Sequence, residues 1–214
     1  IYEIFCHLNE TEFEAQALEF LKAREEMIDE GLLLKYRAAL GEKEAVIDIL
    51  RSCLEDEEAD VRFWAVHGLG KLGQGKERVV NALLVCLNDP ELRVRCSAAH
   101  ALRELGQSSE IVVNTLLSHL NDESGGMRTA AARALGKLGR GSEKIINTLL
   151  SRLKDENYFM RSSAAKALGK LGQGSETVVD ALLLHLDDEN SRVRFSTAHA
   201  LGELGENSER VINA

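Results

Sequence analysis

A period of 33 residues is the feature that most constrains the fold of this 214-residue chain. One aspartate, one arginine and one glycine each recur five times at this spacing, with no insertion or deletion between the units. The three rows are Asp56, Asp89, Asp122, Asp155 and Asp188; Arg62, Arg95, Arg128, Arg161 and Arg194; and Gly73, Gly106, Gly139, Gly172 and Gly205. Uninterrupted repeats of this length indicate stacked units that contact mainly their neighbours. Such a stack presents an extended binding surface, and the period alone identifies no reaction.

Each unit reads as two helices. In the second unit, apolar residues at helical spacing predict one helix over about residues 76–87 and another over about residues 90–105. Asp89 and its equivalents are expected to cap the second helices, and the glycines of the third row are expected to end them in the left-handed conformation. Glycines at 70, 136, 169 and 202 predict close approach between helices. Serines at 109, 142, 175 and 208 suit the caps of the first helices. The predicted fold is all-α, an α-solenoid.

The period also divides the chain. Residues 1–41 do not fit it and predict a helical N-terminal cap or junction. Five repeats follow, at 42–73, 74–106, 107–139, 140–172 and 173–205. Residues 206–214 match the opening of a sixth repeat that is cut off, so we expect a fragment of a longer protein.

The composition limits the classes of partner that the chain is expected to bind. A net charge of −9 argues against binding to nucleic acid, because nonspecific affinity for nucleic acid comes from Lys and Arg that neutralise phosphates. No apolar run approaches the ~18 residues that a membrane-spanning helix needs. The four cysteines, Cys6, Cys53, Cys86 and Cys96, form no disulfide or metal pattern, so reduced thiols and a cytoplasmic location are expected.

No constellation for catalysis, a cofactor or a metal stands out. The segment from Gly70 to Glu77 has P-loop spacing, but Glu77 stands where Ser or Thr should hold magnesium, and a helix precedes it. His67 and His100 are one repeat apart, too far for ligands that must each lie within ~2.1 Å of one zinc ion. We therefore predict neither a cofactor nor a metal site.

The pattern Leu-x-Asp-x5-Arg-x2-Ala-Ala-x-Ala-Leu-Gly-x-Leu-Gly resembles HEAT repeats, in particular the short bacterial type named after phycobilisome lyases. The resemblance covers residues 42–205 and extends through the truncated sixth repeat. In HEAT proteins the matching Asp and Arg form a ladder of hydrogen bonds between successive repeats. The resemblance therefore implies a structural role for the Asp and Arg rows, which occur in every repeat rather than at one place. It also implies that the second helices line the concave side of the stack.

The second helices carry variable residues opposite their buried stripe. One row contains His67, His100, Arg133, Lys166 and His199, which suggests an acidic partner segment, although a solvated helix face would also carry such residues. Aromatic side chains and Arg often dominate binding sites, while Trp64 or Tyr158 could instead fill a gap in the core. The predicted partner-binding residues are Phe63, Trp64, His67, Lys71, His100, Arg133, Tyr158, Phe159, Lys166, Arg192, Phe195 and His199.

These features favour a non-catalytic scaffold or sensor module that binds a protein in its concave groove. Similar arrays occur in NACHT-type signalling NTPases, and this resemblance suggests that the chain is part of such a protein. The alternative that the repeat type implies is a phycobilin lyase or isomerase subunit that handles a bilin chromophore. A HEAT-like DNA-binding or glycosylase domain conflicts with the acidity. The oligomeric state stays open.

Overall fold

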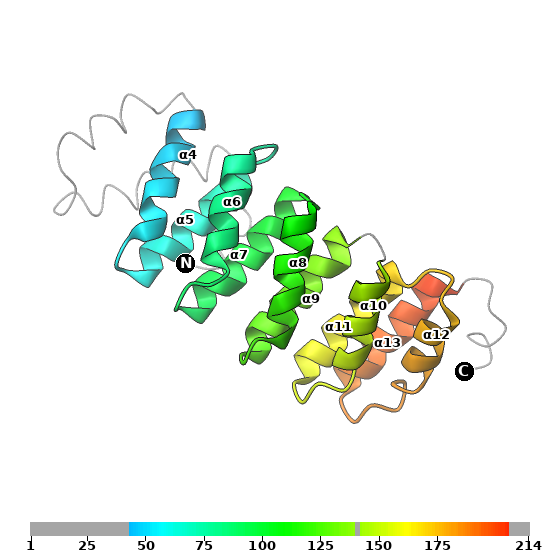
Figure 1. Cartoon of the computed structure of the whole chain (residues 1–214). Coiled ribbons are helices and arrows are strands. Elements are labelled where there is room, and N and C mark those ends of the chain that lie inside the picture. The colour runs from blue at the N-terminus through cyan, green and yellow to red at the C-terminus, as the bar shows by residue number, and fades with distance from the viewer. Residues whose placement is uncertain (1–42, 140–141, 206–214) are drawn as a thin grey trace.

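The computed structural model describes residues 43–139 and 142–205 (Figure 1). This part of the chain is helical and contains no strand. Its elements are α4 (Lys43–Ser52), the 3-10 helix η1 (Cys53–Glu55), α5 (Ala59–Leu72), α6 (Glu77–Cys86), α7 (Leu92–Leu105), α8 (Glu110–Ser118), the 3-10 helix η2 (His119–Asn121), α9 (Gly125–Leu138), α10 (Glu143–Arg152), α11 (Tyr158–Leu171), α12 (Glu176–Leu183) and α13 (Ser191–Leu204).

The helices alternate between two layers along the stack (Figure 1). We call α4, α6, α8, α10 and α12 the A helices, and α5, α7, α9, α11 and α13 the B helices. Each B helix contains 14 residues, and their first residues are 33 apart, as the period requires. This arrangement confirms the predicted α-solenoid. The predicted N-terminal segment (1–41), the start of the sixth repeat (206–214), Ser208 and Cys6 lie outside the described residues.

The aspartate row does not cap the B helices, so that prediction was wrong. Helix α7 begins at Leu92, its N-cap is Glu91, and Pro90 lies before the helix. Asp89 Oδ1 instead accepts a hydrogen bond from the backbone N–H of Glu91 at 2.8 Å. This is an Asx turn, in which an Asp side chain binds the backbone two residues on. The same bond occurs in the other four repeats, so the aspartates shape the turn that leads into each B helix.

The glycine row was also largely misinterpreted. Gly106 has a φ of 68° and ends α7 in the left-handed conformation, as predicted. At Gly73 the φ is −84°, and the equivalents at 139, 172 and 205 also have negative φ. Space rather than backbone conformation explains Gly73, because a Cβ there would lie 2.5 Å from Cγ1 of Val79. The serine caps are confirmed for α8, α10 and α12, where a serine side chain accepts from the N–H three residues on.

The core lies between the two layers and runs without interruption along the stack. Leu83 of α6 and Leu102 of α7 are both fully buried, and Leu135 of α9 is buried in the same way. Burying this apolar stripe is what holds each helix in place, since neither helix of a pair could cover its own.

The B helices approach one another closely. A Cβ added at Gly70 of α5 would lie 2.7 Å from the Cβ of Ala101 in α7, and glycines 136 and 169 face α11 and α13 in the same way. These contacts confirm the predicted close approach at glycines 70, 136 and 169. At Gly202 an added Cβ would meet nothing within 4 Å among the described residues, so the prediction is not confirmed there. Successive A helices are packed far less closely than successive B helices. The stack therefore curves with the B helices on its concave side.

Candidate functional site

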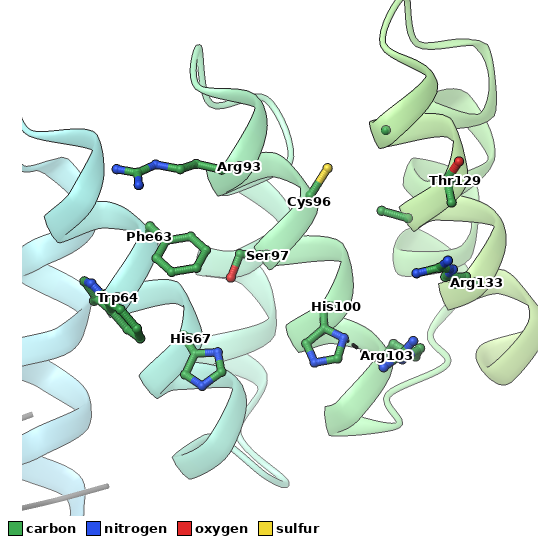
Figure 2. Close-up of a pocket in the computed structure, with 12 residues that line it drawn as sticks. Phe63, Trp64, His67, Arg93, Cys96, Ser97, His100, Arg103, Thr129 and Arg133 are labelled. Atoms are coloured by element: carbon green, nitrogen blue, oxygen red, sulfur yellow. Dashed lines mark hydrogen bonds between the residues drawn. The ribbon is translucent and has the colours of Figure 1, made fainter. Parts of the chain in front are cut away.

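A cavity of about 420 Å³ opens on the concave face across α5, α7 and α9 (Figure 2). Its wall contains five of the predicted partner-binding residues: Phe63, Trp64, His67, His100 and Arg133. These residues project from equivalent faces of three successive B helices, which is why a helical repeat brings them together. The other lining residues are Arg93, Cys96, Ser97, Arg103, Gly126, Thr129 and Ala130.

The α5 side of this cavity is aromatic. The rings of Phe63 and Trp64 meet edge to face with centroids 5.1 Å apart, and His67 lies 5.9 Å from Trp64. Arg93 from α7 stands over Phe63 at 5.5 Å and forms an ion pair with Asp60. Burial, with repulsion from Lys71 and His100, lowers the pKa of His67 to about 4. His67 is therefore neutral at pH 7 and belongs to an apolar wall rather than a basic one.

A second cavity, of about 360 Å³, lies farther along the concave face across α7, α9 and α11. Its lining residues are Arg103, Glu104, Arg133, Gly136, Lys137, Ser162, Ser163, Lys166, Ala167 and Lys170. Five of these side chains are basic and one is acidic, in a chain whose net charge is −9. The concave face thus changes from aromatic near α5 to strongly basic near α11.

Arg103 and Arg133 line both cavities and connect them. Arg103 donates to Nδ1 of His100 at 2.8 Å and to Oε1 of Glu104 at 2.9 Å. The first bond requires a neutral His100, because a guanidinium can only donate. Burial lowers the pKa of His100, with Arg103 the next cause, which agrees with that bond. Nε of Arg133 donates to Oγ of Ser163 at 3.3 Å.

The remaining predicted partner-binding residues lie outside these two cavities. Tyr158 and Phe159 stack at the start of α11 with centroids 4.2 Å apart, and Arg192 of α13 lies 5.1 Å over the Phe159 ring. Phe195 is 67% exposed. Lys71 and His199 are exposed on α5 and α13. This second group would extend a binding surface rather than line the cavities.

Arg103 is the main residue that the sequence interpretation missed. It stands in the row that contains glycine at 70, 136, 169 and 202, so it breaks the repeat at one unit. This departure from the repeat can be seen in the sequence and could have identified Arg103. Lys137 and Lys170 were visible in a variable row of the B helices but were not selected.

The Asp and Arg rows connect neighbouring repeats at four joints. Arg62 donates from Nε to Asp89 Oδ2 at 2.7 Å and from Nη2 to Oδ1 at 2.9 Å. Arg128 with Asp155 and Arg161 with Asp188 make the same two bonds at 2.8–2.9 Å. Between Arg95 and Asp122 the distance is 3.8 Å.

Each arginine of this row also binds its own repeat. Nη1 donates to the carbonyl oxygen of the aspartate six residues earlier, as Arg62 does to Asp56 at 2.8 Å and Arg194 to Asp188 at 2.9 Å. At three of the joints, one arginine side chain (Arg62, Arg128 or Arg161) thus holds the turn of its own repeat and, through Nε and Nη2, the turn of the next.

Within the described residues there is no group of three or more His, Cys, Asp or Glu side chains placed to hold a metal ion. Cys86 and Cys96 are free thiols, and burial raises the pKa of Cys86 to about 11. None of the described helices is long and apolar enough to cross a membrane.

Comparison with solved structures returns other helical repeat proteins. The complex of CpcE and CpcF of phycocyanin lyase from Nostoc sp. PCC7120 matches with a TM-score of 0.63 and 23% identity, over 74% of this chain and 65% of that chain. This chain thus spans less than two thirds of the lyase chain's length. A designed armadillo repeat protein in complex with peptide (KR)4 matches at 0.56 and 17% identity, over 92% and 100% of the two chains. At these identities the likeness shows the fold alone.

A comparison with curated proteins finds no match. The family comparison is decisive, because the HEAT repeats family matches residues 32–103, 47–136, 80–157 and 113–202, which together cover residues 32–202. The chain belongs to the HEAT repeat family.

Proposed function

We propose that this chain is a non-catalytic protein-binding module whose concave face takes up an acidic segment of a partner protein. The observation that carries the proposal is the charge contrast between the molecule and its concave face. The chain has a net charge of −9, yet the charged side chains of the second cavity are five bases and one acid. Potentials of opposite sign guide encounter and fix the register of a bound partner.

The form of the face favours an extended segment over a compact small molecule. The two cavities share Arg103 and Arg133 and follow one another across α5, α7, α9 and α11. Phe63 and Trp64 would anchor an apolar side chain at one end, since aromatic residues bury much area at small entropic cost. The basic residues near α11 would orient the acidic part.

A chain of the same fold supports this geometry. The designed armadillo repeat protein is in complex with the peptide (KR)4, so a helical solenoid of this class can hold a peptide. Here the lining charges have the opposite sign to those that a basic peptide needs. An acidic peptide is therefore the complementary ligand.

The proposal can be tested by selecting binders to the chain from a random peptide library. We expect the selected peptides to be enriched in Asp and Glu and to bind more weakly as salt rises. Two variants with equal charge change make the test specific: Lys166→Glu with Lys170→Glu on α11, and Lys144→Glu with Lys154→Glu outside the concave face. All four lysines are exposed, so both variants should fold.

The concave variant should lose binding and the control variant should keep it. Selection of neutral or basic peptides, or equal binding by both variants, would refute the proposal. The alternative of a bilin-handling subunit has its own readout, since purified chain mixed with a bilin would shift the absorption spectrum of the chromophore.

A further inference from the structure

The joint between α7 and α9 differs from the other joints between B helices. At three of the four joints a glycine of one B helix faces an alanine of the next, and a Cβ added at the glycine would lie 2.7–3.0 Å from the alanine Cβ. At this joint the position of the glycine is taken by Arg103, and the equivalent alanine is Ala134. Since Arg103 has a Cβ, α7 and α9 cannot approach as closely as the other pairs.

The ladder contact confirms that this joint is wider. Arg95 Nη2 lies 3.8 Å from Asp122 Oδ1, where the other three ladder pairs are bonded at 2.7–2.9 Å. Nε of Arg95 is buried and has no hydrogen-bond partner. Helices α7 and α9 are also packed less closely than any other successive B helices. The substitution at position 103 thus widens the concave face where the two cavities meet.

Two guanidinium groups lie at this opening, one from each side. Figure 2 shows Arg103 and Arg133 in the space between α7 and α9. Among the described residues Arg133 makes no ion pair, and its one hydrogen bond goes to a serine. Desolvation, then repulsion from Arg192 and Arg103, lowers the pKa of Arg133. Glu104, which pairs with Arg103, is the one acidic side chain in the lining of the second cavity, so the positive charge here is only partly balanced and a bound anion would stabilise it further.

The amount of charge selects the kind of anion. The basic side chains of the second cavity number five and the acidic ones number one, which leaves a lining charge of +4. One carboxylate would bring a charge of −1, whereas a phosphomonoester brings about −1.5 to −2 with three acceptor oxygens. Guanidinium groups bind phosphate through several charge-assisted hydrogen bonds. Arg103 donates from Nε and Nη2 to Glu104, and Arg133 donates from Nε to Ser163, so Nη1 of Arg103 and both Nη groups of Arg133 are the donors that a ligand would meet.

We propose that the widened joint between α7 and α9 binds a phosphoryl group carried by the partner segment, held between Arg103 and Arg133. Arg103 then has two roles, because its Cβ separates the helices and its guanidinium contacts the ligand. Lys137 and Lys166 supply further positive charge around the phosphoryl oxygens. This inference rests on the proposed function and specifies the partner as a phosphopeptide.

The test uses one short acidic peptide in three forms, with serine, glutamate or phosphoserine at its centre, and measures binding to the full chain by fluorescence anisotropy. Loss of one charge-assisted hydrogen-bond pair corresponds to roughly tenfold in affinity. We expect the phosphoserine form to bind about tenfold or more tightly than the glutamate form. Arg103→Ala should remove most of that preference, while Lys144→Ala should leave it unchanged.

A second variant separates the charge of Arg103 from its forked donors. Arg103→Lys keeps the Cβ and the charge but not the forked donors, so the acidic peptides should still bind while the preference for phosphoserine falls. Equal affinity for the glutamate and phosphoserine forms would overturn this inference and leave the proposed function standing. If none of the three peptide forms bound, both this inference and the proposed function would be overturned. If inorganic phosphate displaced the phosphopeptide at concentrations comparable to the peptide itself, the ligand would be free phosphate, and the peptide assignment would be wrong.

Discussion

The contact between Arg128 and Asp155 allows a quantitative test of how the repeats are held together. Replacing Asp155 with Asn keeps an oxygen for the backbone N–H of Asn157 but removes the charge that Arg128 binds. The two side chains are 8% and 3% exposed, so the guanidinium would lose its main partner away from water. Breaking a buried pair from one side costs about 3–5 kcal/mol. We expect about 3 kcal/mol, the lower end of that range, because Glu156 remains 3.3 Å from Arg128.

The matched control is Asp122→Asn at the joint between α7 and α9. Asp122 makes the same turn, accepting from the N–H of Ser124 at 2.8 Å, but lies 3.8 Å from Arg95. The Arg95 and Asp122 side chains are 18% and 16% exposed, and a loose pair of this kind contributes about 0–1 kcal/mol. The two substitutions are chemically identical, so the turn and the change in charge cancel in the comparison. What differs is the contact between repeats and the side chain three residues earlier, which is Arg152 at 3.7 Å from Asp155 and His119 at 3.6 Å from Asp122.

Urea unfolding followed by circular dichroism measures both free energies, and urea is chosen because guanidinium salts screen ion pairs. Hydrogen exchange should show faster opening at the joint between α9 and α11 in the Asp155→Asn variant, since a repeat array can open locally. Equal costs within about 0.5 kcal/mol, the usual error of such comparisons, would refute the reasoning. So would a larger cost for Asp122→Asn.

Three further outcomes are expected. Leu135→Ala should cost about 2–5 kcal/mol, because its side chain is fully buried, and hydrogen exchange should speed up in both neighbouring repeats rather than in one alone. Gly202→Ala should raise the urea midpoint through a gain in helix propensity of up to about 1 kcal/mol, whereas Gly169→Ala should lower it, because its Cβ would lie 2.7 Å from a Cβ of α13; the reverse order would contradict the close approach. Burial acts to raise the pKa of Asp188, but the hydrogen bond from Arg161 and other favourable contacts outweigh it and lower the pKa. A lowered carboxyl pKa adds stability that is present above the unfolded value of about 3.9 and is lost as pH falls through the folded value. The buried imidazoles of His67 and His100 also have lowered pKa values, so the urea midpoint should begin to fall below about pH 6.5 and fall more steeply below about pH 4; a midpoint that rises on acidification would count against this.

The α-solenoid could be predicted from the sequence because the buried positions that produce it recur with a fixed period. A buried position such as Leu102 recurs at 69, 135, 168 and 201, and helical spacing within the unit places it on one face. The hydrogen bonds at the helix N-termini could not be predicted from the sequence. Asp89 is as good a partner for a turn as for a helix N-terminus, and only the backbone geometry shows that it binds Glu91 and that α7 begins at Leu92.

The candidate site was partly predictable for the same reason. Phe63, His100 and Arg133 were found because variable residues on one helix face of a solenoid share one surface. Tyr158 and Phe195 satisfied the same rule but lie outside both cavities. The rule orders residues around a helix and does not measure the distance between helices.

The repeated pair of helices, the buried stripe and the acidic charge of the molecule could all be predicted from the sequence, because they depend on residue type and spacing along one chain. The tertiary structure decided the width of each joint. The exchange of glycine for Arg103 is visible in the sequence, but its effect depends on Ala134 in the next B helix and on the stretched contact between Arg95 and Asp122. These groups meet only when the repeats stack, so the opening on the concave face follows from packing between units and not from the pattern of any single unit.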